Sequence, residues 1–284
     1  MKMKKFNRLL SFIILTLLVS FCFPTTVYSK TVKDTRYIGV TSDVHNNIPN
    51  LTKWLSNLES TTTSMDYMIF GGDYVGKTSA ESCVSAVKNQ FSGTPSILAK
   101  GNHDKGKGGK YDSGLVVNND DYAIYVMDSS SKSFTSSDMK NLKSSLDQIN
   151  SSKPVFVVSH CPIHYFRKRT IGNAEKLLSL LNNHKNVIFL WGHNHSKKDP
   201  NYGTVKVKGD TIQCSKSSSA VHINFTYANM GAMNQGNNGA YGLLMNLINS
   251  SGNTNIKFYY KRSFRQNCFK LFCGYQLTGI IYIN

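Results

Sequence analysis

The sequence predicts an α/β protein, and three observations support this fold class. Five short apolar runs, rich in β-branched and aromatic residues, each end in polar residues, as the buried strands of an α/β sheet do. Stretches with helical spacing of apolar residues lie between these runs, and the alternation of strand and helix predicts a layered fold. Beyond residue 195 the chain carries short strands separated by turns, which predict a largely antiparallel sheet of their own.

Residues 1–29 have the features of a secretory signal peptide. Four basic residues come before an apolar stretch over 9–23, and Val27 and Ser29 suit the positions three and one residues before a cleavage site. The alternative is a retained membrane anchor, although the apolar stretch is short for a span of about 20 residues. We therefore expect a secreted or extracellular protein.

The rest of the chain is long enough for one α/β domain. Removal of the signal leaves 255 of the 284 residues, and we expect a single domain over 30–264 and a tail of unassigned structure over 265–284. Loss of the four basic residues lowers the net charge from +17 to +13. A basic exterior attracts anionic polymers or an anionic cell surface, and the alternative is that scattered lysines only keep the protein soluble. No protein partner is predicted.

The cysteines predict neither a disulfide framework nor a zinc site. Five remain after the signal, an odd and sparse set without the paired spacing of zinc ligands. A bridge between Cys268 and Cys273 is compatible with export, and the sequence leaves it open.

The predicted elements follow in a regular order. The strands that end in polar clusters cover 37–45, 65–73, 96–104, 155–162 and 187–195. The predicted helices cover 48–58, 80–91, 136–149 and 171–181. A further strand at 122–128 ends in Asp128, which we interpret as a turn residue. The later short strands cover 204–207, 211–214, 220–227, 241–247 and 255–260.

The polar clusters at the strand ends contain residue types that bind divalent cations. They are Asp43 with His45, Asp73, Asn102 with His103 and Asp104, His160, and His193 with His195. Loops at the carboxyl ends of strands in an α/β sheet converge on one crevice, so these side chains can meet in space. Carboxylate, imidazole and amide donors without thiolates suit two ions of manganese, iron, zinc or nickel. The sequence therefore predicts a two-metal hydrolase site.

These motifs closely resemble the calcineurin-like metallophosphoesterase superfamily. Their order is Asp-x-His, Gly-Gly-Asp, Gly-Asn-His-Asp, a lone His and Gly-His-x-His, and the resemblance covers 37–195. It implies a four-layer α/β/β/α sandwich of two mixed β-sheets. It also implies one ion bound by Asp43, His45 and His195, a second bound by Asn102, His160 and His193, and Asp73 as the bridging carboxylate.

The resemblance further implies how such a site works. In the family, a metal-activated hydroxide attacks phosphorus in line, and a histidine donates a proton to the leaving oxygen. The motif places this role on His103, whose imidazole would be oriented by a hydrogen bond to the carboxylate of Asp104.

Three loops supply further hypotheses. The segment with His164, Arg167 and Arg169 resembles a loop that approaches substrate in some secreted bacterial members, and we expect the histidine and one arginine to contact the phosphate or leaving group. The alternative is a solvated loop. The Gly- and Lys-rich residues 105–114 offer donors and charge to a phosphate, or form a mobile surface loop. Residues 229–239 are predicted to form a turn or rim loop.

Departures from two subfamilies narrow the expected function. Purple acid phosphatases carry a tyrosine where this chain has Gly76, and Ser/Thr protein phosphatases end their third motif in Glu where this chain has Asp104. We therefore expect a secreted phosphoesterase that acts on a phosphate ester, with a phosphodiester or nucleotide favoured over a monoester. The alternatives are a non-catalytic metal- or phosphate-binding module and a cell-surface interaction module on the same fold.

Overall fold

The computed structural model describes residues 34–235, 240–250, 253–262 and 276–283. The predicted signal peptide, residues 1–29, lies outside these ranges, and so do Cys268 and Cys273. Cys83, Cys161 and Cys214 are buried free thiols. Among the described residues, no helix has the length and apolar character needed to cross a membrane.

Strand β1 (Asp34–Thr41) is central in the first of two large sheets. It pairs in parallel with β2 (Tyr67–Phe70) on one side and antiparallel with β13 (Tyr241–Ser250) on the other. The described part of this sheet has seven strands, and β12 (Gly231–Ala232) pairs with β13 beside the main path. The order on the main path is β15 (Gln276–Ile283), β14 (Asn253–Arg262), β13, β1, β2 and β3 (Ser96–Leu98).

The second sheet is parallel in its centre and antiparallel at its edges. Its order is β4 (Gly114–Asn118), β5 (Ala123–Met127), β6 (Val155–Ser159), β7 (Val187–Trp191), β11 (Thr226–Asn229) and β8 (Val205–Lys206). Strands β5, β6, β7 and β11 pair in parallel, and β4 and β8 pair antiparallel with their neighbours. Two short strands, β9 (Thr211–Ile212) and β10 (Val221–His222), form a separate hairpin.

The prediction that the strands after residue 195 form a sheet of their own is wrong. Strands β13 and β14 extend the first sheet from β1, whereas β11 and β8 extend the second sheet from β7. An uncovered edge of β1 or β7 would leave a row of backbone N–H and C=O groups unpaired, and the later strands satisfy these groups. The end of the tail forms β15 at the edge of the first sheet.

Four helices were predicted, and each is present among the described residues: α2 (Ile48–Glu59), α3 (Lys77–Gln90), α4 (Ser136–Gln148) and α5 (Ala174–Leu181). Helix α4 begins with a capping box, in which Thr135 and Asp138 satisfy each other's backbone N–H groups. Helix α5 begins three residues later than predicted. Asn173, directly before the helix, has a left-handed backbone with a φ of 63°, which prevents the helix from extending back to Ile171.

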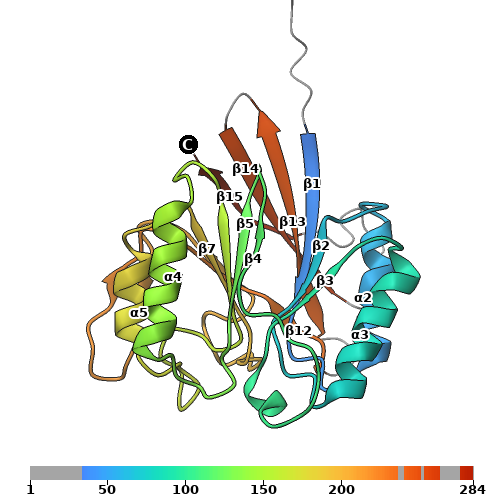
Figure 1. Ribbon diagram of the computed structural model, residues 1–284, viewed down its shortest axis with the longest axis horizontal. Helices are drawn as coiled ribbons and strands as arrows, with labels where there is room; N and C mark the ends of the chain where they lie inside the picture. The colour runs from blue at the N-terminus through green and yellow to red at the C-terminus, as the bar shows by residue number, and fades with distance from the viewer. Residues whose placement is uncertain (1–33, 236–239, 251–252, 263–275, 284) are drawn as a thin grey trace, which may run out of the picture. The chain divides into compact units, whose positions relative to one another are not determined.

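The elements form a four-layer α/β/β/α sandwich, which confirms the expected fold class. Apolar residues of both sheets meet in the middle, for example Ile38 and Val40 with Phe156. Helices α2 and α3 cover the outer face of the first sheet, and α4 and α5 cover the outer face of the second (Figure 1). In β5, Ile124 and Val126 face the other sheet while the alternate residues face the helices. Burial on both faces explains why these strands are continuously apolar.

Candidate metal centre

The candidate ligands come together at the carboxyl ends of β1, β2, β6 and β7. Two groups of side chains have ligand atoms within 4.8 Å of one another. One group is Asp43, His45 and His195, and the other is Asp73, His160 and His193. The resemblance implies the first group as one ion site and His160 with His193 in the other, with Asn102 as their third ligand and Asp73 as a bridge.

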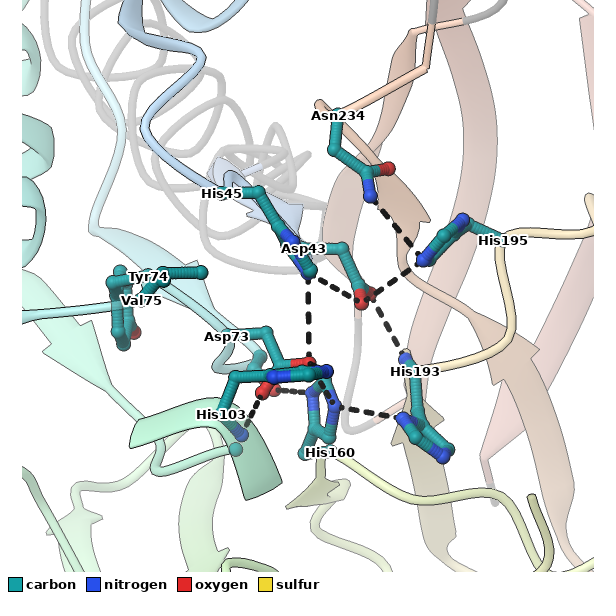
Figure 2. A network of polar contacts seen from close by, with 12 residues as sticks. Asp43, His45, Asp73, Tyr74, Val75, His103, His160, His193, His195 and Asn234 are labelled. Carbon is teal, nitrogen blue, oxygen red and sulfur yellow. Dashed lines mark hydrogen bonds and ion pairs between the residues drawn. The ribbon is translucent and has the colours of Figure 1, made fainter. Parts of the chain in front are cut away.

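Asp73 lies between the two groups. Its Oδ2 is 3.6 Å from Nε2 of His45 and 3.1 Å from Nε2 of His160 (Figure 2). In the first group, Oδ1 of Asp43 is 3.7 Å from Nε2 of His45 and 3.9 Å from Nε2 of His195. One carboxylate in this position can share its charge between two cations.

The second group has a defined imidazole orientation. Nδ1 of His160 lies 2.8 Å from the carbonyl oxygen of Gly71, which can only accept, so Nδ1 carries a proton. Nε2 of the same ring is directed into the centre, 3.2 Å from Nδ1 of His193. A backbone carbonyl that fixes the outer nitrogen in this way leaves the inner nitrogen to a metal ion.

The backbone at four candidate ligands has a positive φ: 49° at Asp43, 45° at His45, 61° at Asp73 and 64° at His193. Non-glycine residues rarely adopt this left-handed region, and such strain concentrates at functional sites. The turns aim each side chain inward from its strand end. Gly101 permits the close approach of a neighbouring turn, because a Cβ there would lie 2.5 Å from the backbone nitrogen of Asp73.

The Gly-Asn-His-Asp motif forms the short 3-10 helix η1 (Asn102–Asp104) beside Asp73. The backbone N–H of His103 donates to Oδ1 of Asp73 at 2.8 Å. The His103 side chain is 57% exposed, and its Nε2 lies 4.0 Å from Oδ2 of Asp73. His103 therefore faces solvent at the mouth of the centre, where an incoming ligand could reach it.

Asp104 does not orient His103, contrary to the expectation from the motif. Its buried carboxylate accepts four backbone N–H groups, those of Asp73 (2.8 Å), Tyr74, Val75 and Gly101 (each 3.0 Å). Within the described residues no hydrogen bond joins it to the His103 ring, and the four N–H groups already occupy both oxygens. Asp104 is thus a positioning residue for the turn that carries Asp73.

Without a metal ion, the carboxylates of the centre and two of its histidines stabilise one another's charged forms. Burial opposes ionisation of Asp43 and Asp73, but nearby histidines, His160 foremost, hold the pKa of each carboxyl below its usual range. Burial also disfavours the charged form of His45, yet the two carboxylates outweigh it and raise the pKa of His45 to about 9. The same carboxylates raise the pKa of His160. A cation would displace these protons.

The other two histidines are held neutral. Burial, together with the charge on His160, lowers the pKa of His193 to about 3. Burial, helped by Arg169 and opposed by Asp43, lowers the pKa of His195. Neutral imidazole is the form that binds metal ions.

The structure separates the three residues of the predicted substrate loop. His164 is 2% exposed and has both ring nitrogens hydrogen-bonded, to Tyr227 and Asp199, so it is not available to a substrate as hypothesised. Arg167 is exposed and lies over the ring of Phe166. Arg169 alone reaches the centre, where it donates to the carbonyl oxygen of His193 at 2.9 Å.

Several residues beside the centre were not predicted from the sequence. Nδ2 of Asn234 lies 3.2 Å from Nε2 of His195 (Figure 2). Nε2 of Gln235 lies 2.9 Å from Nδ1 of the same ring. Both belong to the segment interpreted as a rim loop. Asn194, between the last two histidines, hydrogen-bonds to Asp199. Only the position of Asn194 inside the Gly-His-x-His motif offered a signal in the sequence.

Four potential metal-binding atoms of the candidate ligands are buried without a hydrogen-bond partner among the described residues. They are Oδ1 of Asp43, Nε2 of His45, Oδ1 of Asn102 and Nε2 of His193. Buried polar atoms in proteins are nearly always satisfied, so such atoms gathered in one place require an explanation. Carboxylate, imidazole and amide donors are ligands of divalent ions such as manganese and zinc. The residues present therefore fit divalent cations.

The chain is similar to a known protein family over the region that contains the candidate ligands. A sequence model described as calcineurin-like phosphoesterase matches residues 36–197, which include every candidate ligand. Curated proteins give no match.

Solved structures with similarity to the chain have low sequence identity. A conserved uncharacterized protein from Streptococcus pneumoniae, described as a predicted phosphoesterase, is 13% identical, with 81% of this chain and 91% of that chain covered and a TM-score of 0.43. Vacuolar protein sorting 29 from Cryptosporidium parvum is 13% identical, with 87% and 96% covered and a TM-score of 0.39. Vps29 from Entamoeba histolytica, complexed with zinc, is 12% identical, with 87% and 99% covered and a TM-score of 0.36.

Proposed function

The chain belongs to the calcineurin-like phosphoesterase family, and from this membership we propose that it is a secreted phosphoesterase that depends on two divalent metal ions. One observation carries the proposal: Asp73 belongs to one group of carboxylates and imidazoles and lies 3.6 Å from His45 of the other, and buried ligand atoms of both groups have no hydrogen-bond partner among the described residues. A set of hard and borderline donors of this kind suits manganese, iron, zinc or nickel.

The proposed ligands divide into two sets. The first ion takes Asp43, His45 and His195, and the second takes His160, His193 and the amide oxygen of Asn102. Asp73 bridges the two. When bound, the ions would lower the pKa of a water molecule and neutralise the charge of a phosphoryl group.

His103 is proposed to donate a proton to the leaving oxygen. In support of this role, its side chain is exposed at the mouth of the centre, and its ring lies 5.4 Å from the ring of His45. Its backbone N–H is fixed on Asp73, so the side chain projects from a constant position. A general acid must be within hydrogen-bond reach of the group that it protonates, which this exposed position allows.

The proposed substrate is a phosphodiester or a nucleotide rather than a simple monoester. The loop that follows His103 carries Lys105, Lys107 and Lys110, all exposed. Lys107 donates to the carbonyl oxygen of Val75, which places the loop beside the turn of Asp73. Lysines in this position, on a chain whose net charge is +13 without residues 1–29, attract anionic substrates that extend beyond a single phosphate.

Hydrolysis of two chromogenic substrates, one phosphomonoester and one phosphodiester, tests the proposal. The protein is loaded with manganese and compared with Asp73→Asn and His103→Ala. We expect activity that EDTA abolishes, with preference for the diester. His103→Ala should lose about 10²- to 10⁴-fold in kcat while it still binds manganese. His222→Ala, an exposed histidine outside both groups, is the matched control and should keep full activity.

The outcomes separate the proposed enzyme from its alternative. Manganese bound at two equivalents without turnover of either substrate would favour a binding module on the same fold. Preference for the monoester would keep the enzyme and overturn the substrate assignment. Export is tested independently by mass spectrometry of the extracellular protein, whose first residue should be Lys30.

A further inference from the structure

A buried polar pair lies behind the candidate metal centre. Nε2 of His164, in the loop after β6, is 2.8 Å from Oδ2 of Asp199, and both residues are 2% exposed. Nδ1 of His164 is 2.8 Å from the hydroxyl oxygen of Tyr227 on β11. Neither residue of the pair belongs to the two candidate ligand groups.

The hydrogen bonds of His164 have one consistent direction. The hydroxyl oxygen of Tyr227 accepts the backbone N–H groups of Ile163 at 2.9 Å and of His164 at 3.4 Å, so its proton is directed to Nδ1. Nε2–H of His164 then donates to the carboxylate of Asp199. Every polar atom of the ring is used, which fixes the position of Asp199.

Asp199 passes this constraint to the last ligand motif. Its Oδ2 also accepts a hydrogen bond from the side-chain amide of Asn194, and its Oδ1 accepts the backbone N–H of Asn201 at 2.9 Å. Asn194 is 1% exposed and lies between His193 and His195. The residue before Asn194, His193, belongs to one candidate ion group, and the residue after it, His195, belongs to the other.

The backbone at this motif needs such an anchor. His193 has a φ of 64°, and the N–H of Asn194 donates to the carbonyl oxygen of Gly192 at 2.7 Å, which closes a tight three-residue turn. A turn of this kind persists only where its surroundings hold it. Two further hydrogen bonds hold the backbone of His193. Its N–H donates to Oδ2 of Asp43 at 2.9 Å, and its carbonyl oxygen accepts from Arg169 at 2.9 Å.

The four side chains that link β11 to the motif form a positioning chain, which consists of Tyr227, His164, Asp199 and Asn194. We propose that the positioning chain sets the location of His193 and His195 and thereby the affinity of both ion sites. The inference rests on the ion binding in the proposed function, but not on turnover. In this proposal His164 and Asp199 act by positioning the candidate ligands, and they do not contact the substrate.

Manganese titration by calorimetry tests this proposal. Asp199→Asn keeps the size of the side chain but replaces one acceptor oxygen by an NH2 group, which must face either the N–H of Asn201 or the N–H donors of both His164 and Asn194. In either case the anchor loses an acceptor, and the bonds of the chain lose the charge of the carboxylate. We expect the affinity for manganese to fall about 10- to 100-fold at both sites, as for other residues that orient metal ligands. Asp147→Asn is the matched control. It breaks a surface carboxylate–imidazole pair with His184, 3.6 Å apart, and should leave manganese affinity unchanged.

A second variant keeps the test valid if Asp199→Asn folds poorly. Asn194→Ala removes only the last link and leaves the pair of His164 and Asp199 intact. The double variant should lose no more affinity than the more affected single variant, because both changes break one chain. Losses that multiply in the double variant would overturn the proposal.

Failure of the inference can be distinguished from failure of the proposed function. Circular dichroism first establishes that each variant is folded at the temperature of the titration. Folded Asp199→Asn with unchanged manganese affinity overturns the positioning role whatever the activity. Wild-type protein that binds two manganese ions without hydrolysing either chromogenic ester overturns the enzyme, while the loss of affinity in Asp199→Asn would still support the positioning chain.

Discussion

Oδ2 of Asp104 accepts the backbone N–H of Asp73 at 2.8 Å, and the same carboxylate binds the two N–H groups that follow. Asp73, the candidate bridging residue, therefore lies in a turn whose backbone N–H groups converge on one buried carboxylate. Successive N–H groups in a turn with left-handed residues form an anion-binding concavity, and here the chain supplies its own anion.

Asp104→Asn is expected to destabilise the protein and weaken ion binding. The amide would direct N–H groups at backbone N–H donors, which leaves buried donors unsatisfied. We expect the free energy of unfolding to fall by on the order of 3 kcal/mol, measured by urea denaturation. Asp128→Asn is the control, because Asp128 is exposed and, within the described part of the chain, its Oδ1 accepts only the local N–H of Ser130. Equal urea midpoints for the two variants would contradict the role assigned to Asp104.

Gly101→Ala should disturb the turn of Asp73 through space alone. A Cβ at Gly101 would lie 2.5 Å from the backbone nitrogen of Asp73, whereas a Cβ at Gly108 would meet nothing within 4 Å. Overpacking of this kind costs about 1–3 kcal/mol, so Gly101→Ala should show a lower melting temperature and weaker manganese binding. Gly108→Ala should match the wild type in both measurements. The steric argument is wrong if Gly101→Ala also matches it.

Arg169 and Arg167 should differ in their effect on catalysis. Arg169 donates to the carbonyl oxygen of His193, whereas Arg167 is exposed beside Phe166. We expect Arg169→Ala to lower kcat/KM for the preferred ester by about tenfold or more, because it removes both a positive charge and an anchor of a candidate ligand. Arg167→Ala should change kcat/KM less than twofold. A larger loss in Arg167→Ala would reverse this assignment.

Without added metal, stability should be greatest near pH 6.5. The raised pKa values of His45, to about 9, and of His160 contribute stability that is present below the unfolded value of 6.5 and is lost as the pH rises toward 9. The lowered pKa values of His193, to about 3, and of His195 act oppositely, so stability is also lost as the pH falls below 6.5.

Urea midpoints in EDTA, measured between about pH 5 and about pH 8.5, check this expectation. Excess manganese should remove the decline above pH 6.5, because ions bind the deprotonated side chains. His45→Gln should show a smaller decline in EDTA than the wild type. A midpoint that rises steadily to pH 8.5 in EDTA would contradict the assignment.

The candidate ligands of the centre could be recognised from local sequence patterns. Asp43, Asp73 and His160 each follow an apolar run, and a buried strand with polar residues at its end is recognisable from a few neighbouring residues. The alternation of strands and helices predicted the layered fold in the same way. Family membership and the four-layer sandwich are confirmed, and the ligand assignments stay predictions that the titrations above can check.

The pairing of strands that lie far apart in the chain could not be predicted from the sequence. Strands β11 (Thr226–Asn229) and β13 (Tyr241–Ser250) lie close together in the chain but join different sheets, because the free edges of β1 and β7 are created only when the sheets assemble. Residue types therefore predicted strands, and tertiary structure decided their neighbours.

The same distinction holds for single side chains. The sequence by itself determined that Asp104 and His164 are titratable residues next to candidate ligands, because that follows from adjacency along the chain. Only the tertiary structure decided that Asp104 holds N–H groups 29 to 31 residues away and that His164 is buried against Asp199, 35 residues away. The direction of a side chain depends on which distant donors and acceptors the packed sheets bring within about 3 Å, and local sequence does not specify these partners.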